Sequence, residues 1–112
     1  MLFRSTPQPN DSRATFIKGL FQDTMYSFLK NFDRPADGRL ILHMDADLYS
    51  STLFALTMLA PYLTPGDIII FDEFNVANHE FAAWHDFVRS YYIKYDVLGA
   101  VNNFYQVAFK IK

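Results

Sequence analysis

The sequence lacks cysteine altogether and contains only four glycines among its 112 residues. Without cysteine there are no disulfide bonds and no thiolate zinc sites, which fits a cytoplasmic protein. The glycines are Gly19, Gly38, Gly66 and Gly99, and no two of them lie close enough to form the glycine-rich turn that opens a dinucleotide-binding fold. The residues present therefore provide no glycine-rich loop for a cofactor.

Long apolar runs and an excess of charge of one sign are also absent. No run of about 18 apolar residues is available to span a membrane, and the first residues contain no apolar segment of a signal peptide. A formal net charge of -2 gives no basic surface for nucleic acid. We therefore expect neither a membrane nor a nucleic acid as a partner. The hydrophobic fraction of 51% is high enough for a buried core.

The chain is expected to fold as one domain over residues 14–112, preceded by a flexible arm over residues 1–13. The arm contains two prolines and no hydrophobic periodicity. Beyond it, apolar segments that suit strands alternate with segments whose apolar residues recur at helical spacing. The predicted strands span residues 15–20, 39–45, 67–72, 95–101 and 104–111, and a helix follows each of the first three.

This alternation predicts an α/β fold of three layers. The segment DIIIF at 67–71 is apolar after its first residue, as expected for a strand that is covered on both faces. Strands of this kind, separated by helices, usually pair in parallel, so a mostly parallel sheet is predicted. Asn102 and Asn103 separate the last two strands and favour a tight antiparallel hairpin at the C-terminal end.

Acidic residues stand where two of these strands end. Asp45 and Asp47 occur at the end of the second predicted strand, and Asp72 and Glu73 at the end of the third. Ligands of an open parallel sheet bind beyond the carboxyl ends of its strands, where these carboxylates would converge if the strands are neighbours. Close carboxylates repel one another unless a cation binds them, and Mg²⁺ prefers oxygen ligands. The alternative is that each acid only caps the helix that follows it.

Four segments carry a resemblance to a known family when they are taken in order. They are FIKGLFQDTMYSFL at 16–29, HMDADLYSST at 43–52, TPGDIIIFDEF at 64–74 and FYQVAFKI at 104–111. Together they resemble class I S-adenosylmethionine (SAM)-dependent O-methyltransferases of the macrocin O-methyltransferase family. The resemblance implies a partial Rossmann-like methyltransferase sheet from which the N-terminal βαβ unit, with its cofactor loop, is missing.

The resemblance also implies roles for individual residues. The positions it marks are Asp45, Asp72 and Glu73 as Mg²⁺ ligands, Phe21 and Gln22 beside the adenine of SAM, and Asp47 on the acceptor side. In such an enzyme, Mg²⁺ would hold the hydroxyl of a sugar or another small molecule in line with the sulfonium methyl group. Because the glycine-rich loop is missing, we expect a truncated form that binds SAM weakly or not at all, with a Kd above about 1 mM.

Two other functions are open on the residues alone. Asp45-Ala46-Asp47 also matches the DxD pattern of metal-dependent glycosyltransferases. The chain could instead be a non-enzymatic half-fold that associates with itself. Absence of the first unit would leave the strand at 39–45 with an open edge, and open edges recruit other chains. We therefore expect a homodimer.

Overall fold

The computed structural model describes residues 10–34 and 37–112, so most of the predicted arm at 1–13 lies outside the described residues. Helices and strands alternate along the chain. Their order is α1 (Phe21–Lys30), β1 (Ile41–Met44), α2 (Tyr49–Leu59), the short 3-10 helix η1 (Ala60–Tyr62), β2 (Ile68–Phe71), α3 (Glu80–Tyr91), β3 (Tyr95–Val101) and β4 (Gln106–Ile111). This is a mixed α/β fold, as predicted. None of the helices in the described residues is long and apolar enough to cross a membrane.

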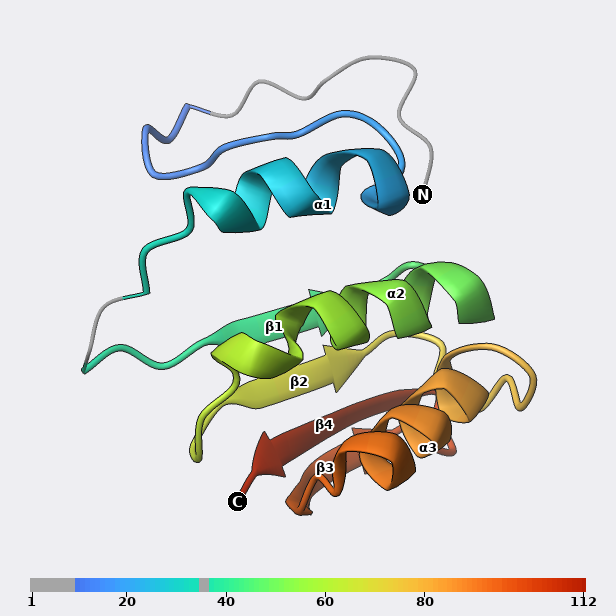
Figure 1. Ribbon diagram of the computed structural model, residues 1–112. Coiled ribbons are helices and arrows are strands. Elements are labelled where there is room, and N and C mark those ends of the chain that lie inside the picture. The colour runs from blue at the N-terminus through green and yellow to red at the C-terminus, as the bar shows by residue number, and fades with distance from the viewer. Residues whose placement is uncertain (1–9, 35–36) are drawn as a thin grey trace.

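The strands form one sheet in the order β1-β2-β4-β3 (Figure 1). β1 and β2 are parallel, whereas β4 is antiparallel to both β2 and β3. The prediction of a mostly parallel sheet is therefore wrong for the described residues. The physical reason is that β4 returns directly from β3 through a short turn and inserts beside β2, which makes both of its pairings antiparallel. The C-terminal antiparallel hairpin itself is confirmed.

The helices cover one face of the sheet, so the described residues form two layers and the predicted third layer is wrong for them (Figure 1). α2 and α3 lie against this face, and α1 lies beside α2. Burial follows the same division, because β2 and β4 alternate strictly between buried and partly exposed residues. A strand covered on both faces would bury its residues without alternation. Ile69, Phe71 and Phe109 lie on the face that the helices cover and are buried. Ile68 and Ile70 lie on the other face and are only half-buried.

The predicted strand at 15–20 is also wrong, because this segment has no strand partner and its residues are exposed. Gly19, with φ 138°, interrupts an extended backbone within this segment, and α1 begins directly after it at Phe21. β1 is consequently an edge strand among the described residues, paired only with β2.

Aromatic rings hold α3 against the sheet. Trp84 stacks on Phe109 of β4 with ring centroids 4.7 Å apart and planes at 10°. Phe71 of β2 meets the edge of Trp84 at a centroid distance of 5.4 Å. All three side chains are almost fully buried. Burial of each contributes about 2–3 kcal/mol to folding, which fixes the position of the first turns of α3 above the sheet.

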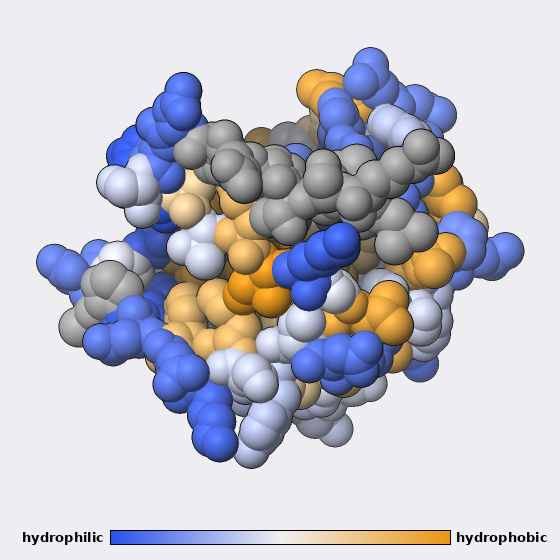
Figure 2. Space-filling model, turned by 90° about the horizontal axis from the view of Figure 1, so that it is seen from above, coloured by the Kyte–Doolittle hydropathy of each residue, from blue (hydrophilic) through white to orange (hydrophobic). Residues whose placement is uncertain are grey.

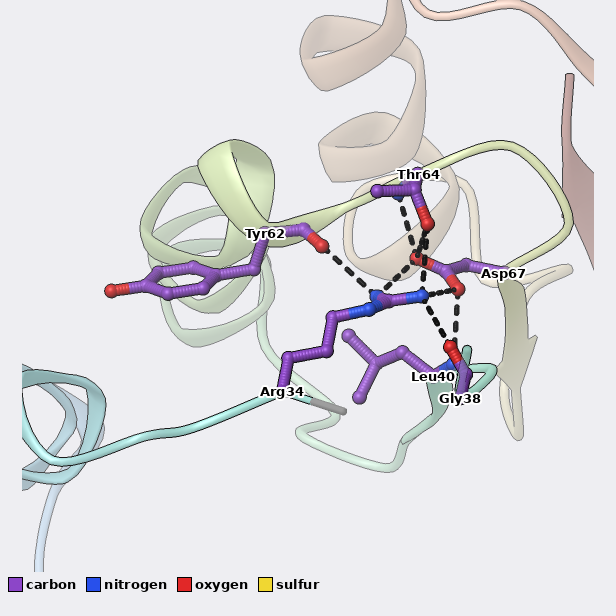
Figure 3. A network of polar contacts seen from close by, with 6 residues as sticks. All are labelled: Arg34, Gly38, Leu40, Tyr62, Thr64 and Asp67. Atoms are coloured by element: carbon purple, nitrogen blue, oxygen red, sulfur yellow. Dashed lines mark hydrogen bonds and ion pairs between the residues drawn. The ribbon is translucent and has the colours of Figure 1, made fainter. Parts of the chain in front are cut away.

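A buried ion pair holds the opposite, N-terminal ends of β1 and β2 (Figure 3). Asp67, directly before β2, accepts hydrogen bonds from Arg34 Nη1 at 2.6 Å, from the Thr64 N–H at 2.8 Å and from the Leu40 N–H at 2.9 Å. Burial alone raises the pKa of Asp67, but these hydrogen bonds lower it below its usual value. Asp67 therefore joins the segment before β1, the end of η1 and the start of β2 at one point.

Candidate functional site

The acidic residues that end β1 and β2 lie at one edge of the sheet. Met44 and Phe71 are register partners in the parallel pair, and the Asp72 N–H donates to the Met44 carbonyl at 3.2 Å. Asp45 and Asp72 therefore follow neighbouring strands at the same level. Burial raises the pKa of Asp45, and the negative charges of Asp72 and Asp47 raise it further. The structure thus brings Asp45, Asp47 and Asp72 together.

Asp47 reaches this cluster through an unusual backbone conformation. Its φ of 65° lies in the left-handed region, which aspartate tolerates better than most residues at a cost of about 1 kcal/mol. The Leu48 N–H donates to the Ala46 carbonyl at 2.7 Å, which closes a tight turn around Asp47. This turn directs Asp47 toward Asp45 instead of along the start of α2.

Asp72 and Glu73 are bonded to neutral side chains of the β3–β4 hairpin. Gln106 Nε2 donates to Asp72 Oδ1 at 2.9 Å, and the Tyr105 hydroxyl donates to Glu73 Oε1 at 3.1 Å. The hydrogen bond to Glu73 is the main reason why the pKa of Tyr105 is raised. Among the described residues, the ion pairs occur at Asp11, Asp67 and Asp96 and do not involve this cluster.

Glu80 belongs to the cluster, although no pattern in the sequence indicates this. Its side chain is fully buried at the first residue of α3, and Oε1 accepts the Glu73 N–H at 2.9 Å. The other carboxyl oxygen, Oε2, is buried and has no hydrogen-bond partner among the described residues. Burial raises the pKa of Glu80, and the charges of Asp45 and Asp47 raise it further. Glu80 is therefore hydrogen-bonded to the loop after β2 and lies near the acids of the loop after β1.

An acid at the start of a helix normally stays exposed and interacts with the helix dipole. Sequence reasoning missed Glu80 for this reason, because its position predicts an ordinary first-turn acid. The only available signal is the surrounding pattern of Phe81, Trp84 and Phe87, which places one face of α3 in the core. That pattern does not reveal that Glu80 turns inward beside the other acids.

The fit of these residues to Mg²⁺ is incomplete. Carboxylate oxygens are the ligand type that Mg²⁺ prefers. The pKa of Asp45 is raised, by burial and by the negative charges of Asp72 and Asp47. However, the described residues contain no group of three or more His, Cys, Asp or Glu side chains that could hold one ion. Gln106 and Tyr105 already bond to Asp72 and Glu73. In this arrangement the side chains therefore do not form a metal centre.

Phe21 and Gln22, predicted to border the adenine of SAM, lie in the first turn of α1 and are exposed. Figure 1 shows this end of α1 on the same side of the molecule as the carboxyl ends of β1 and β2. Gly19 precedes this turn with φ 138°, and a Cβ there would lie 2.8 Å from Thr24 Cγ2. The local geometry thus requires glycine, while the roles of Phe21 and Gln22 stay predictions.

The family model described as macrocin-O-methyltransferase (TylF) matches residues 8–107. The chain belongs to the macrocin-O-methyltransferase family. The predicted family is therefore confirmed, over nearly the whole chain.

Individual relatives are also O-methyltransferases by name. The chain is 31% identical over 92 residues to 8-demethyl-8-(2,3-dimethoxy-alpha-L-rhamnosyl)-tetracenomycin-C 4'-O-methyltransferase of Streptomyces olivaceus, a match that covers 82% of this chain and 31% of the relative. It is 32% identical over 87 residues to demethyldecarbamoylnovobiocin O-methyltransferase of Streptomyces niveus, with 78% and 29% covered. For mycinamicin III 3''-O-methyltransferase of Micromonospora griseorubida the identity is 32% over 80 residues, with 67% and 29% covered. The chain thus spans about a third of the length of these relatives.

Proposed function

We propose that this chain forms the acceptor-side part of a SAM-dependent O-methyltransferase that methylates a hydroxyl group of a sugar or another small molecule. The observation that carries the proposal is the convergence of Asp45, Asp47 and Asp72 at one sheet edge, in a chain of the macrocin-O-methyltransferase family. The names of the relatives support an oxygen acceptor on a small molecule.

Methyl transfer to a hydroxyl needs alignment and a destination for the proton. The new C–O bond forms as the S–C bond of SAM breaks, and the hydroxyl proton passes to a base. Asp47, the acceptor-side residue, supplies a carboxylate that accepts a hydrogen bond from the hydroxyl. The methyl ether and S-adenosylhomocysteine are the products. The raised pKa of Asp45 indicates that this edge holds a proton more readily than an exposed carboxylate does.

SAM itself needs contacts that these residues do not provide. Phe21 and Gln22 lie on an exposed helical turn, and they cannot replace the backbone N–H groups of a glycine-rich loop. In isolation the chain should therefore bind SAM with a Kd above about 1 mM by calorimetry. Micromolar affinity would contradict this expectation and show that the chain holds the cofactor alone.

A chimera tests the function directly. Residues 15–112 would replace the matching segment of the Streptomyces niveus relative, and methyl transfer from labelled SAM to that relative's acceptor would be measured. We expect transfer by the chimera and a loss of about 100-fold with Asp47→Asn. The control is Asp96→Asn, an exposed aspartate on β3. A folded chimera that binds SAM but transfers no methyl group would contradict the proposal.

The glycosyltransferase alternative has no support beyond the DxD pattern, because the family match places Asp45 and Asp47 in a methyltransferase segment. As they lie, Asp45, Asp72 and Glu73 do not form a site for Mg²⁺, and they would hold the ion only after their side chains rearranged around it.

Self-association is the second property that a specific observation favours. The side of the molecule that carries α1 shows apolar side chains at the surface between charged ones (Figure 2). The exposed apolar residues of the segment 16–28 and of β1 include Phe16, Ile17, Leu20, Phe28 and Ile41. An edge strand beside exposed apolar groups favours pairing with a second copy.

We therefore propose a homodimer, which light scattering over a dilution series would measure. Ile41→Lys should weaken the dimer, because a charge on β1 opposes edge pairing. Val76→Lys, at an exposed apolar residue of the loop after β2, is the control and should leave the mass unchanged. A monomer at high micromolar concentration would contradict the homodimer.

A further inference from the structure

A cavity of about 470 Å³ lies between α3 and the β3–β4 hairpin. Its walls are mainly aromatic and include Phe74, Phe81, Trp84, Tyr95, Phe104 and Phe109, and the polar lining residues are Asn75, His85 and Asn103. The volume falls in the usual range of small-molecule sites, which are largely apolar with a few polar groups. The cavity is too large and too apolar to be a water or ion site.

The cavity adjoins the acidic edge, because the same two loops build both. Phe74 directly follows Asp72 and Glu73 in the sequence. Phe104 directly precedes Tyr105, whose hydroxyl donates to Glu73 Oε1 at 3.1 Å. The Phe74 N–H donates to the Tyr105 carbonyl at 2.8 Å, which joins the two loops. The carboxylates do not line the cavity themselves, and Phe74 and Phe104 are the lining residues that adjoin the acidic edge along the chain.

Phe104 combines an exposed ring with a left-handed backbone conformation, and neither contributes to the stability of the fold. It is 58% exposed, and its φ of 64° makes it the third consecutive residue in the left-handed region after Asn102 and Asn103. A bulky residue is rare in this conformation and strains the backbone. Strain combined with an exposed aromatic ring is unfavourable for the unliganded fold. A flat occupant of the cavity would cover the ring and offset this disadvantage.

We propose that this cavity binds a flat aromatic portion of the methyl acceptor and presents the acceptor's hydroxyl group to the acidic edge. The inference rests on the proposed function and adds the chemical class of the substrate to it. Aromatic rings favour a planar aromatic occupant over a puckered aliphatic one, because offset stacking and edge contacts add to simple burial. Asn75 Nδ2 donates to the Asn103 carbonyl at 3.3 Å and sets the width between the two loops.

Trp84 provides a direct measurement of occupancy. It is the only tryptophan of the chain, so one indole N–H signal appears in a ¹H–¹⁵N NMR spectrum. Its Nε1 has no hydrogen-bond partner among the described residues. The 112-residue chain would be titrated with 1-naphthol as the probe. We expect a saturable shift of the Trp84 signal with a Kd below about 1 mM, and cyclohexanol should bind at least about fivefold more weakly.

A matched pair of variants distinguishes binding in the cavity from non-specific binding to exposed aromatic residues. Phe104→Ala removes a cavity wall and should weaken 1-naphthol binding at least about fivefold. The control is Tyr92→Ala, because Tyr92 is also an exposed aromatic residue in the left-handed region, with φ 56° and 88% exposure, but does not line the cavity. It should leave binding unchanged. A folded parent chain without a saturable shift, or equal losses in the two variants, would overturn the proposed binding site.

The chimera separates this inference from the proposed function. With an active chimera, Phe104→Ala should raise KM for an aromatic acceptor without a matching fall in kcat. Methyl transfer with an unchanged KM would overturn the acceptor assignment while the proposed function stands. Binding of 1-naphthol by the parent chain together with a chimera that is folded but inactive would overturn the proposed function, and the acceptor assignment with it.

Discussion

A buried carboxyl group lies at each end of the β1–β2 pair. The pKa of one group is lowered by its surroundings, and the pKa of the other is raised. Asp67, at the N-terminal end, meets Arg34 and two backbone N–H groups, which together lower its pKa. Glu80, near the C-terminal end, accepts one backbone N–H, from Glu73, and has no ion-pair partner among the described residues. Burial raises its pKa, and the acids Asp45 and Asp47 raise it further. The first end is arranged for stability, whereas the second keeps negative charge close together at some cost.

The difference predicts opposite effects of pH. The lowered pKa of Asp67 means that its contribution to stability is present above the unfolded pKa and is lost as the pH falls through the folded pKa. The raised pKa of Glu80 means that its contribution is complete below the unfolded pKa and is lost as the pH rises through the folded pKa. The two ends of this strand pair can thus be distinguished by the pH dependence of the free energy of unfolding.

The largest effect is expected from Asp67→Ala. This change leaves Arg34 without its partner and two backbone N–H groups without an acceptor, at a cost of about 3 kcal/mol in the free energy of unfolding. Urea denaturation would measure it. Asp96→Ala is the control, because Asp96 is exposed and its ion pair with Lys112 contributes little. Equal stabilities for the two variants would show that the buried network does not hold the strand ends.

A smaller effect is expected at Glu80. Glu80→Ala should destabilise the fold by about 1–2 kcal/mol, because the Glu73 N–H loses its acceptor and the buried side chain leaves a space. Glu80→Gln keeps an acceptor oxygen and removes the charge, so its stability should match or exceed that of the parent at high pH. The measurement is urea denaturation from pH 4 to 9. If Glu80→Gln retained the parent's loss of stability with rising pH, the raised pKa would have to belong to another group.

The smallest effect concerns a cation at the acidic edge. Mg²⁺ or Ca²⁺ should bind only at millimolar concentration, because the ligands have to exchange their bonds to Tyr105 and Gln106 for the ion. NMR titration of the parent and of Asp45→Asn would compare the amide signals of residues 45–47 and 72–73. The variant should respond less. Identical titration curves would exclude Asp45 as a ligand.

The acidic edge could be predicted from the sequence because each acid follows an apolar strand, and parallel neighbouring strands bring their ends together. The strand at 95–101 and the hairpin can also be predicted from local sequence, because two apolar segments are separated by the turn residues Asn102 and Asn103. The segment at 15–20 could not be judged in this way. Its apolar residues suit a strand, but a strand also needs a partner, and partners are decided by the whole sheet.

Buried carboxyl groups mark the limit of such reasoning. Asp67 and Glu80 each stand next to an element boundary, where an acid usually caps a helix or faces solvent. Whether one of them meets an arginine or other acids depends on residues about 30 positions away, such as Arg34 for Asp67 and Asp47 for Glu80. Local periodicity carries no information about these partners.

The position of β4 has a consequence for how the chain acquires its structure. β4 lies between β2 and β3, and it pairs with both. Until residues 106–111 have been synthesised, only the short β1–β2 pair can form, and two strands alone are marginally stable in water. Before β4 is available, the apolar faces of α2 and α3 are not covered by the complete sheet. Exposed apolar surface of this kind makes nascent chains prone to aggregation. The sheet is therefore completed only when its central strand β4 has been added. The helices form before they are stabilised by packing against the complete sheet.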